Sequence, residues 1–241
     1  LKNEKDIFSD IYESILNKEE RKKYAQFFTH KELVKFIVSQ LPINKSSKIL
    51  DPACGVGAFL IEAYKNNNQD FNNLYGIDID HKAVELCKLN LKLNTKENNS
   101  NFNIINANTI KDFNLKESFP DIFNEGGFDI IIGNPPFQNL NIDEGYFKDD
   151  ATYSKILSGI ANSATLILAK SYELLKDDGY LGFVLPKNII RVDSFKKLRS
   201  FLIENTKLVS IYDIDHYFKD VRCDQIILIF QKKKLTQEEL N

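Results

Sequence analysis

Methionine is missing from all 241 residues, and the chain does not begin with it. We therefore expect a trimmed form of a longer polypeptide. A strong positive charge is also missing, because the net charge is −2 and the sequence pI is about 6.0. The overall charge thus gives no indication of nucleic-acid binding.

Paired cysteines and long apolar runs are absent as well. Cys54, Cys87 and Cys223 lie far apart without a CxxC spacing, which argues against a disulfide framework or a zinc site and favours a reducing compartment. No apolar run approaches the length needed to cross a bilayer. The first 17 residues are charged and amphipathic, unlike a signal peptide. We predict a soluble cytoplasmic protein without a metal or a membrane partner.

What is present is an alternation of strand and helix patterns in a chain that is 43% hydrophobic, enough for one sizeable α/β core. Strands are predicted at residues 48–50, 74–77, 102–105, 128–132, 180–185, 208–212 and 225–230. Helices are predicted at residues 7–16, 31–41, 58–65, 82–93, 164–175 and 194–203, with Thr29 as the cap of the second. Such alternation predicts a mainly parallel sheet covered on both faces. The last two strands are joined by only about a dozen residues without a helical pattern, so we expect the last strand to be antiparallel.

The first motif is DPACGVGAF at residues 51–59, between a predicted strand and a helix. Glycines at that place let the backbone approach a ligand closely. A dinucleotide site is disfavoured because the third small residue would fall at the bulky Leu60, and Asp51 would repel a pyrophosphate. An acid there suits a cationic ligand. The alternative is a tight turn that binds nothing.

The second motif is YGIDID at residues 75–80. Asp78 ends the next strand, where a carboxylate hydrogen-bonds a ribose diol, and Ile79 is placed to pack on an adenine face. Asp80 is expected to cap the following helix, and a capping role is also the alternative for Asp78.

The third motif is NPPF at residues 134–137, directly after the apolar strand that ends in Gly133. The two prolines stop the strand and stiffen the loop, and Asn134 is held away from helical geometry by the proline that follows it. The loop therefore presents one amide and one aromatic face in a fixed geometry, as a site for a flat ligand would. The polar segment 138–152 is predicted to be a mobile loop over that site.

Together these motifs resemble those of the S-adenosylmethionine-dependent N6-adenine DNA methyltransferases, which carry DPxxGxGxF, an acidic ribose residue and [DN]PP[FYW] in this order. Three further segments are similar to that family: KKYAQFFT at residues 22–29, which resembles a GQFFTP segment in the γ motif order, LLKDDGYLGFVLP at residues 174–186, and YFKDVR at residues 217–222 before the last strand. The resemblance covers roughly residues 20–231.

The resemblance implies a Rossmann-like class I methyltransferase fold with a doubly wound, mostly parallel seven-stranded sheet and an antiparallel last strand, preceded by N-terminal helices. It divides the chain into N-terminal helices with a cofactor-closing segment (1–44), a catalytic domain (45–231), and a linker or the start of a further region (232–241). It also implies contacts to S-adenosylmethionine from Gln26, Phe28, Thr29, Asp51, Pro52, Ala53, Cys54, Gly55, Gly57, Asp78, Ile79 and Asn108. Asn108 stands where the family often has an acid that accepts from the adenine amino group, which an amide oxygen can also do.

The implied chemistry concerns an exocyclic amine, a poor nucleophile because its lone pair is delocalised into the ring. The Asn134 amide oxygen and the Pro135 carbonyl oxygen would accept its two hydrogens and direct the lone pair at the methyl group, so that positioning and electrostatics supply most of the acceleration. Pro136 stiffens the loop, Phe137 would stack on the flipped-out base, and Phe218 would hold its other face or edge. For both phenylalanines the alternative is ordinary core packing.

Several readings of function stay open at this point. The same loop could act on a protein glutamine amide or on guanine N2 of ribosomal RNA, and the chain could be a cofactor-binding subunit without catalysis. The 22–29 segment and the Phe218 motif favour adenine in double-stranded DNA, with sequence recognition by a C-terminal domain or a specificity subunit in a restriction–modification setting. A basic group formed by Lys187, Arg191, Lys196, Lys197 and Arg199 either faces phosphates or is a solvated helix face.

Overall fold

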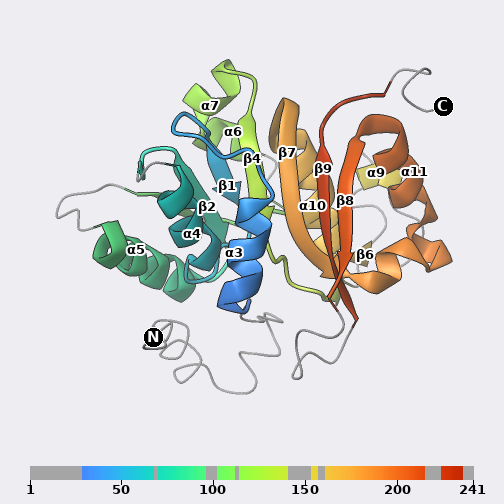
Figure 1. The fold of residues 1–241 in the computed structure, drawn as a ribbon, viewed down its shortest axis with the longest axis horizontal. Helices are drawn as coiled ribbons and strands as arrows, with labels where there is room; N and C mark the ends of the chain where they lie inside the picture. Colours follow the sequence, from blue (N-terminus) through green and yellow to red (C-terminus); the bar gives the residue numbers. More distant parts are fainter. Residues whose placement is uncertain are drawn as a thin grey trace.

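The computed structural model describes residues 29–67, 70–95, 102–111, 114–140, 153–156, 161–214 and 224–235. Seven strands form one sheet in the order β3–β2–β1–β4–β7–β9–β8 (Figure 1). Their bounds are β1 Ile49–Asp51, β2 Leu74–Asp78, β3 Asn103–Asn106, β4 Phe128–Gly133, β7 Leu175–Pro186, β8 Lys207–Asp213 and β9 Gln225–Gln231.

Neighbouring strands pair in parallel except at β9, which is antiparallel to both β7 and β8. The predicted doubly wound sheet with an antiparallel last strand is therefore confirmed. The predicted helix at 7–16, which would precede it, lies outside the described residues.

Helices cover both faces of the sheet (Figure 1). One face carries α3 Lys31–Ser39, α4 Ala58–Asn66 and α5 His81–Thr95. The other carries α6 Leu115–Ser118, α7 Pro120–Asn124, α9 Tyr153–Ile156, α10 Ser163–Leu174 and α11 Lys196–Asn205. The two short 3-10 turns η1 Lys187–Ile190 and η2 Asp193–Phe195 join β7 to α11.

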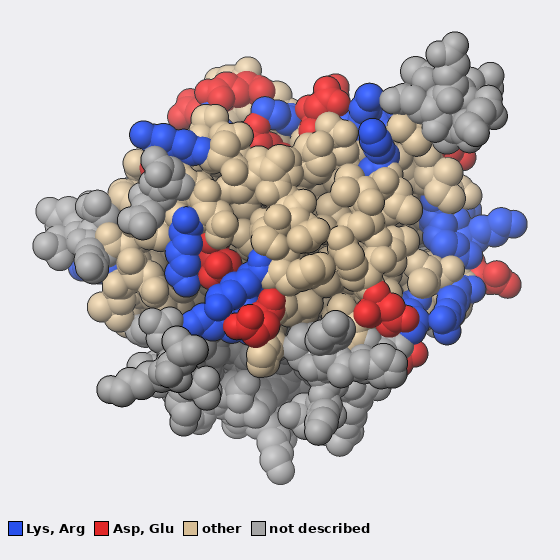
Figure 2. Space-filling model, in the orientation of Figure 1, with Lys and Arg blue, Asp and Glu red and all other residues tan. Residues whose placement is uncertain are grey.

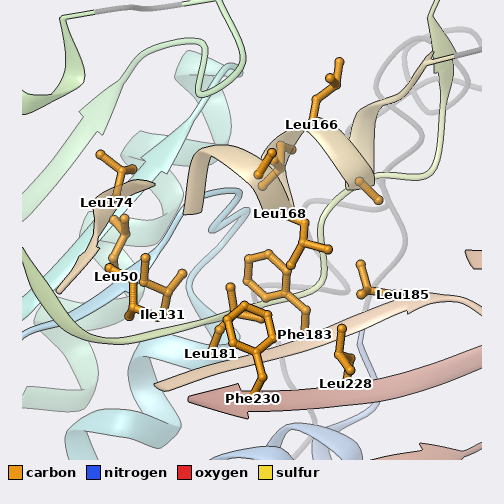
Figure 3. Packing of buried hydrophobic residues seen from close by; sticks show 14 of the residues in the cluster. Leu50, Ile131, Leu166, Leu168, Leu174, Leu181, Phe183, Leu185, Leu228 and Phe230 are labelled. Carbon is orange, nitrogen blue, oxygen red and sulfur yellow. The ribbon is translucent and has the colours of Figure 1, made fainter. Parts of the chain in front are cut away.

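The central strands are apolar because helices bury them from both sides. Ile130 and Ile132 of β4 belong to the core cluster under α3 and α4, whereas Ile131 belongs to the cluster under α10. Figure 3 shows the second cluster, in which Leu168 of α10 lies close to Phe183 of β7. Alternate residues of one strand thus face two separate apolar layers, which fixes the register of the sheet.

The cap of α3 differs from the prediction. His30, not Thr29, is the N-cap, and its Nδ1 accepts a hydrogen bond from the Glu32 N–H at 3.4 Å. The Thr29 hydroxyl is instead engaged by Asn134, a residue 105 positions away. A long-range contact has therefore replaced the local one that the sequence pattern favours.

Two element boundaries also differ from the sequence predictions. The strand predicted at residues 180–185 begins earlier, because β7 starts at Leu175, which pairs with Phe128. The register then shifts around Asp178, whose φ is +62°. Aspartate tolerates this left-handed conformation better than most residues. The predicted loop at 138–152 is wrong at its first residues, because β5 (Asn139–Leu140) pairs with β6 (Ala161–Asn162); residues 141–152 lie outside the described ranges.

Among the helices that the structure describes, none is both long enough and apolar enough to span a bilayer.

The packing of α3 generates a test of the fold. Ile37 is 0% exposed, and Ile203 of α11 is 68% exposed. We expect Ile37→Ala to lower the free energy of unfolding by about 2–5 kcal/mol, because it removes buried methyl groups and leaves a cavity. Ile203→Ala, the same chemical change at the surface, should shift it by less than about 0.5 kcal/mol. Urea unfolding measures both, and equal losses would contradict the buried position of α3.

Candidate functional site

The residues of the DPACGVGAF, YGIDID and NPPF motifs lie at the carboxyl edge of the sheet, where β1, β2 and β4 end side by side. The register pairs Asp51 with Gly76 and Leu50 with Ile131. Because these strands are parallel, the loops that follow them open at one edge, as ligand sites do in open α/β sheets. The three motifs, far apart in sequence, are thus brought together.

The last residues of β1 and β4, Asp51 and Gly133, lie very close together. Asp51 is 1% exposed, and a Cβ placed on Gly133 would lie 2.7 Å from Asp51 Oδ1. A side chain at residue 133 would therefore collide with this carboxylate, and only glycine permits the approach. Asp51 Oδ1 also accepts from the Ala53 N–H at 3.1 Å, which fixes the start of the loop.

The two loop glycines have different structural roles. Gly55 has φ +51°, and a Cβ there would meet no described atom within 4 Å, so the space beside it is open. Gly57 has φ +90°, and a Cβ there would lie 2.7 Å from the Cys87 Sγ of α5. Gly55 therefore offers room for a ligand, whereas Gly57 allows α5 to pack closely against the loop.

Asp78 joins the first two motifs. Its Oδ2 accepts from the Gly55 N–H at 2.8 Å, and its Oδ1 accepts from the Asp80 N–H at 2.8 Å. Asp80 in turn accepts from the Lys82 N–H at 2.9 Å at the start of α5, which confirms its predicted capping role. Ile79, between the two acids, is 53% exposed. The ribose and adenine contacts of Asp78 and Ile79 stay predictions.

Burial raises the pKa values of Asp51 and Asp78. Desolvation is the main cause that raises the pKa of Asp51 to about 8, and the nearby charge of Asp78 raises it further. The hydrogen bond from the Ala53 N–H lowers the pKa of Asp51, but by less. Desolvation likewise raises the pKa of Asp78 to about 6, although the N–H groups of Asp80 and Gly55 lower it. A cation bound beside these two carboxyl groups would favour their charged forms.

The loop after β3 approaches the same edge. The Thr109 hydroxyl donates to the Pro52 carbonyl oxygen at 2.6 Å. Asn108 Oδ1 accepts from the N–H groups of Ile110 at 3.0 Å and Lys111 at 3.1 Å. An adenine amino group would have to compete with both for this oxygen, so the Asn108 contact stays a prediction.

The Asn134 side chain links the NPPF loop to the start of the described chain. Asn134 Nδ2 donates to Thr29 Oγ1 at 3.0 Å. Within the described part of the chain, its Oδ1 accepts no hydrogen bond, and Asn134 is half-buried while Pro135 is buried. The amide therefore uses its nitrogen for the protein and keeps its oxygen for another donor.

Sequence reasoning missed the residue that holds the other side of this loop. The Ser163 hydroxyl donates to the Pro136 carbonyl oxygen and accepts from the Gln138 N–H at 2.9 Å, and the Ser163 N–H donates to the Gln138 carbonyl at 2.8 Å. Asn162 caps α10 by accepting from the Ala164 N–H at 3.0 Å. An Asn-Ser pair ahead of an apolar helix is an N-cap signal, which marks the helix start although not its long-range partner.

The aromatic predictions are only partly covered by the structure. Phe137 is half-buried and packs against both core clusters, so it contributes to the core as well as to the rim of the site. Its contact with a base stays a prediction. Gln26, Phe28 and Phe218 lie outside the described residues.

The basic group is divided by the structure. Lys187 is buried and forms an ion pair with Asp213 at 2.6 Å. Arg199 Nη1 donates to the carbonyls of Ile189 at 2.9 Å and Val192 at 2.7 Å. Lys187 and Arg199 are therefore engaged within the fold, so the alternative of a solvated helix face does not describe them. Contact of the basic group with phosphates stays a prediction. Arg191, Lys196 and Lys197 are exposed, and Figure 2 shows Lys and Arg side chains gathered at the edge of the molecule where α11 lies.

Comparison with known proteins identifies one family. The model of the family described as N-6 DNA Methylase matches residues 3–240. Among curated proteins, the chain is 30% identical to the Type II methyltransferase M.VspI of Vibrio sp. (strain 343), over 93% of this chain and 52% of that protein. It is 24% identical to the methylase subunit of the Type I restriction enzyme MpnII of Mycoplasma pneumoniae, over 97% of this chain and 45% of that protein.

The fold has solved counterparts. The methyltransferase subunit of a type I restriction–modification system from Streptococcus thermophilus superposes with a TM-score of 0.69 at 20% identity, covering 88% of this chain and 45% of that one. This likeness supports the fold alone. The chain spans about half the length of the curated relatives M.VspI and MpnII.

The buried acid generates a pH prediction. The pKa of Asp51 is about 8 in the folded protein, whereas the ordinary value for its carboxyl group is 3.8. Between about pH 4 and pH 8, the folded state therefore keeps a proton that the unfolded state has already released. The free energy of unfolding should therefore fall as the pH rises through this window. We expect Asp51→Asn to flatten this fall by at least about 1 kcal/mol between pH 5 and pH 8. Denaturant unfolding over that range measures it, with the exposed Asp193→Asn as control; parallel curves for wild type and Asp51→Asn would contradict the prediction.

The hydrogen bonds of Ser163 to the NPPF loop give a second prediction. Ser163→Ala removes a hydroxyl that accepts from the Gln138 N–H, so this amide should exchange with solvent about tenfold faster, the factor for the loss of one net hydrogen bond. Hydrogen–deuterium exchange of the peptide containing residues 134–140 measures the change. Ser200→Ala on the exposed side of α11 is the matched control, and unchanged exchange in Ser163→Ala would show that the loop is held by other contacts.

Proposed function

Because the chain belongs to the N-6 DNA methylase family, we propose that it transfers a methyl group from S-adenosylmethionine to N6 of an adenine in DNA. The observation that carries this proposal is the junction of the NPPF loop with the Asp51 loop. Gly133 lies against the Asp51 carboxylate, and Asn134 follows with its amide oxygen available for a donor. A substrate amine held by Asn134 is thereby adjacent to the loop that offers room for a ligand.

S-adenosylmethionine is the cofactor that membership of this family implies, and when bound it supplies a methyl group on a positively charged sulfur. The residues present fit this group. Space is open beside Gly55, and two buried acids with raised pKa values suit a cation. Exposed Ile79 suits the face of an adenine ring. We propose that Asp51, Gly55, Asp78 and Ile79 hold the cofactor.

The chain's own part in the reaction is to bind the substrate amine and to orient it. Asn134 Oδ1 and the Pro135 carbonyl oxygen would accept the two N6 hydrogens, which localises the nitrogen lone pair and directs it toward the methyl group. The prolines and the Ser163 hydrogen bonds keep these acceptors in place before the substrate arrives. Preorganised acceptors of this kind stabilise the developing charge without reorganisation. Phe137 would cover one face of the base.

The partial span bears on substrate selection. Since the chain covers 52% and 45% of M.VspI and MpnII, we propose that it is a catalytic core. The target sequence in double-stranded DNA would be read by a further domain or by a specificity subunit, and the location would be cytoplasmic. The adenine would leave the duplex at a cost of a few kcal/mol, partly offset by stacking on Phe137. Exposed Arg191, Lys196 and Lys197 are available for phosphates.

Substrate class is tested with labelled S-adenosylmethionine. The intact protein, with any subunit it requires, is offered double-stranded DNA, ribosomal RNA and a cell protein extract in parallel. We expect label in DNA, recovered as N6-methyladenine after digestion to nucleosides. Label on RNA guanine or on a protein glutamine would replace this proposal by one of those activities, and no transfer to any of the three would favour a cofactor-binding subunit.

The role of the loop is tested by Asn134→Ala. Without the amide oxygen, kcat should fall by ~10²-fold or more, the scale for loss of one oriented hydrogen-bonding group at a reacting centre. The dissociation constant of S-adenosylmethionine, measured by calorimetry, should stay within about twofold. Asn124→Ala, at an exposed position of α7, is the control with the same chemical change. Turnover at the wild-type rate in Asn134→Ala would remove the loop from the mechanism.

A further inference from the structure

The turn at residues 54–57, within the DPACGVGAF motif, has more backbone freedom than most turns because two of its residues are glycine. Gly55 and Gly57 flank Val56 and have φ values of +51° and +90°. Glycine enters such conformations easily, and it leaves them as easily. A turn of this composition keeps one shape only where contacts from other parts of the chain restrain it.

A buried amide on α5 supplies such a restraint. Asn90 is 3% exposed, and its Nδ2 donates to the Val56 carbonyl oxygen at 3.0 Å, across 34 residues of sequence. A carbonyl oxygen can only accept a hydrogen bond, so this contact assigns the amide nitrogen of Asn90 to Val56. Asn90 Oδ1 in turn accepts from Asn94 Nδ2 at 3.0 Å. Both ends of the Asn90 amide are therefore engaged, and its orientation is fixed.

α5 also packs against the side chains of the turn. Val56 is buried with Ala83, and Leu86 packs against both. A Cβ on Gly57 would lie 2.7 Å from Cys87 Sγ. The helix itself is anchored, because Cys87 is 0% exposed and belongs to the core cluster under α3 and α4. Asn90 thus reaches the turn from a rigid element.

The hydrogen bond of Asn90 restrains a complete peptide unit. The Val56 carbonyl and the Gly57 N–H belong to the same planar peptide group. Asn90 binds the oxygen of this group, and the Cys54 carbonyl accepts from its N–H at 2.8 Å. On the other side of Val56, the Gly55 N–H donates to Asp78 Oδ2 at 2.8 Å. Without Asn90, only one hydrogen bond would hold the peptide that joins Val56 to Gly57.

We propose that Asn90 is a positioning residue for the cofactor, which holds the turn at residues 54–57 in the shape that binds S-adenosylmethionine. This inference rests on the proposed function, which places the cofactor in the open space beside Gly55. A turn that is ordered before the cofactor arrives loses less binding free energy to its own ordering. Loss of Asn90 should therefore weaken cofactor binding. The catalytic rate with bound cofactor should be kept, since the hydrogen bonds of Asn90 reach the turn and not the NPPF loop.

A second buried asparagine separates this role from simple support of the fold. Asn67 is 0% exposed, and its Nδ2 donates to the Asp70 carbonyl oxygen. It follows the end of α4 and precedes β2, whereas the candidate site lies where β2 ends. Asn67→Ala therefore removes the same kind of buried amide at a place remote from the turn.

The experiment compares Asn90→Ala with Asn67→Ala in the intact methyltransferase. We expect the dissociation constant of S-adenosylmethionine, from calorimetry, to rise about five- to tenfold in Asn90→Ala, the range for one net hydrogen bond. It should stay within about twofold of wild type in Asn67→Ala. At saturating S-adenosylmethionine and DNA, kcat of Asn90→Ala should also stay within about twofold of wild type.

Hydrogen–deuterium exchange gives a measurement that does not depend on activity. In the protein without cofactor, the peptide containing residues 54–60 should exchange several-fold faster in Asn90→Ala than in wild type, because the turn opens more often. Asn67→Ala should leave the exchange of this peptide unchanged. Asn90→Leu, which fills the volume of the amide without a donor, replaces Asn90→Ala should the smaller side chain fail to support folding.

The outcomes distinguish this inference from the function beneath it. A wild type that binds S-adenosylmethionine but transfers no methyl group to DNA would refute the proposed function alone, because the dissociation constants still test Asn90. A wild type that does not bind the cofactor would refute both. An unchanged dissociation constant in Asn90→Ala, or an equal rise in Asn67→Ala, would overturn the role of Asn90. Failure of both Asn90→Ala and Asn90→Leu to fold would make Asn90 a residue of the fold and would also overturn it.

Discussion

The close approach of β1 and β4 at their carboxyl ends is the constraint on which the candidate site depends. Gly133 passes so near the buried Asp51 carboxylate that a single added carbon would lie 2.7 Å from its oxygen. The strands bring the loops to one edge, but this contact sets how near they come. The proposed methyl transfer requires a close approach of this kind, since reacting atoms have to be held within a few ångströms of one another.

The same approach creates an electrostatic imbalance. Burial raises the pKa values of Asp51 and Asp78 to about 8 and about 6, so the unliganded edge holds carboxyl groups that water would ionise more readily. A structure optimised for stability alone would have little use for such groups, whereas a site for a positively charged ligand gains from them. The raised pKa values thus support the proposed binding of a positively charged cofactor at this edge.

Long-range hydrogen bonds give the site its rigidity. Asn134 is tied to Thr29, Pro136 to Ser163 and Pro52 to Thr109, in each case across at least 27 residues of sequence. Each bond links a loop to a helix start or to another loop, so the acceptors of the NPPF loop are supported from two sides. Catalysis by positioning requires such support, because a small displacement of an acceptor costs much of its effect.

The sequence by itself determined the seven strands, the antiparallel β9, the three motifs and the family, because apolar runs, proline and glycine positions and motif spacing are local patterns. It did not determine that Thr29 forms a hydrogen bond with Asn134 and leaves the cap of α3 to His30, or that Ser163 forms hydrogen bonds to the NPPF loop. Nor did it show that Lys187 and Arg199 are engaged by Asp213 and by backbone carbonyls. Local propensity offers each of these side chains several partners of similar energy. Only the packed sheet and helices, which fix the distances between segments remote in sequence, select one of them.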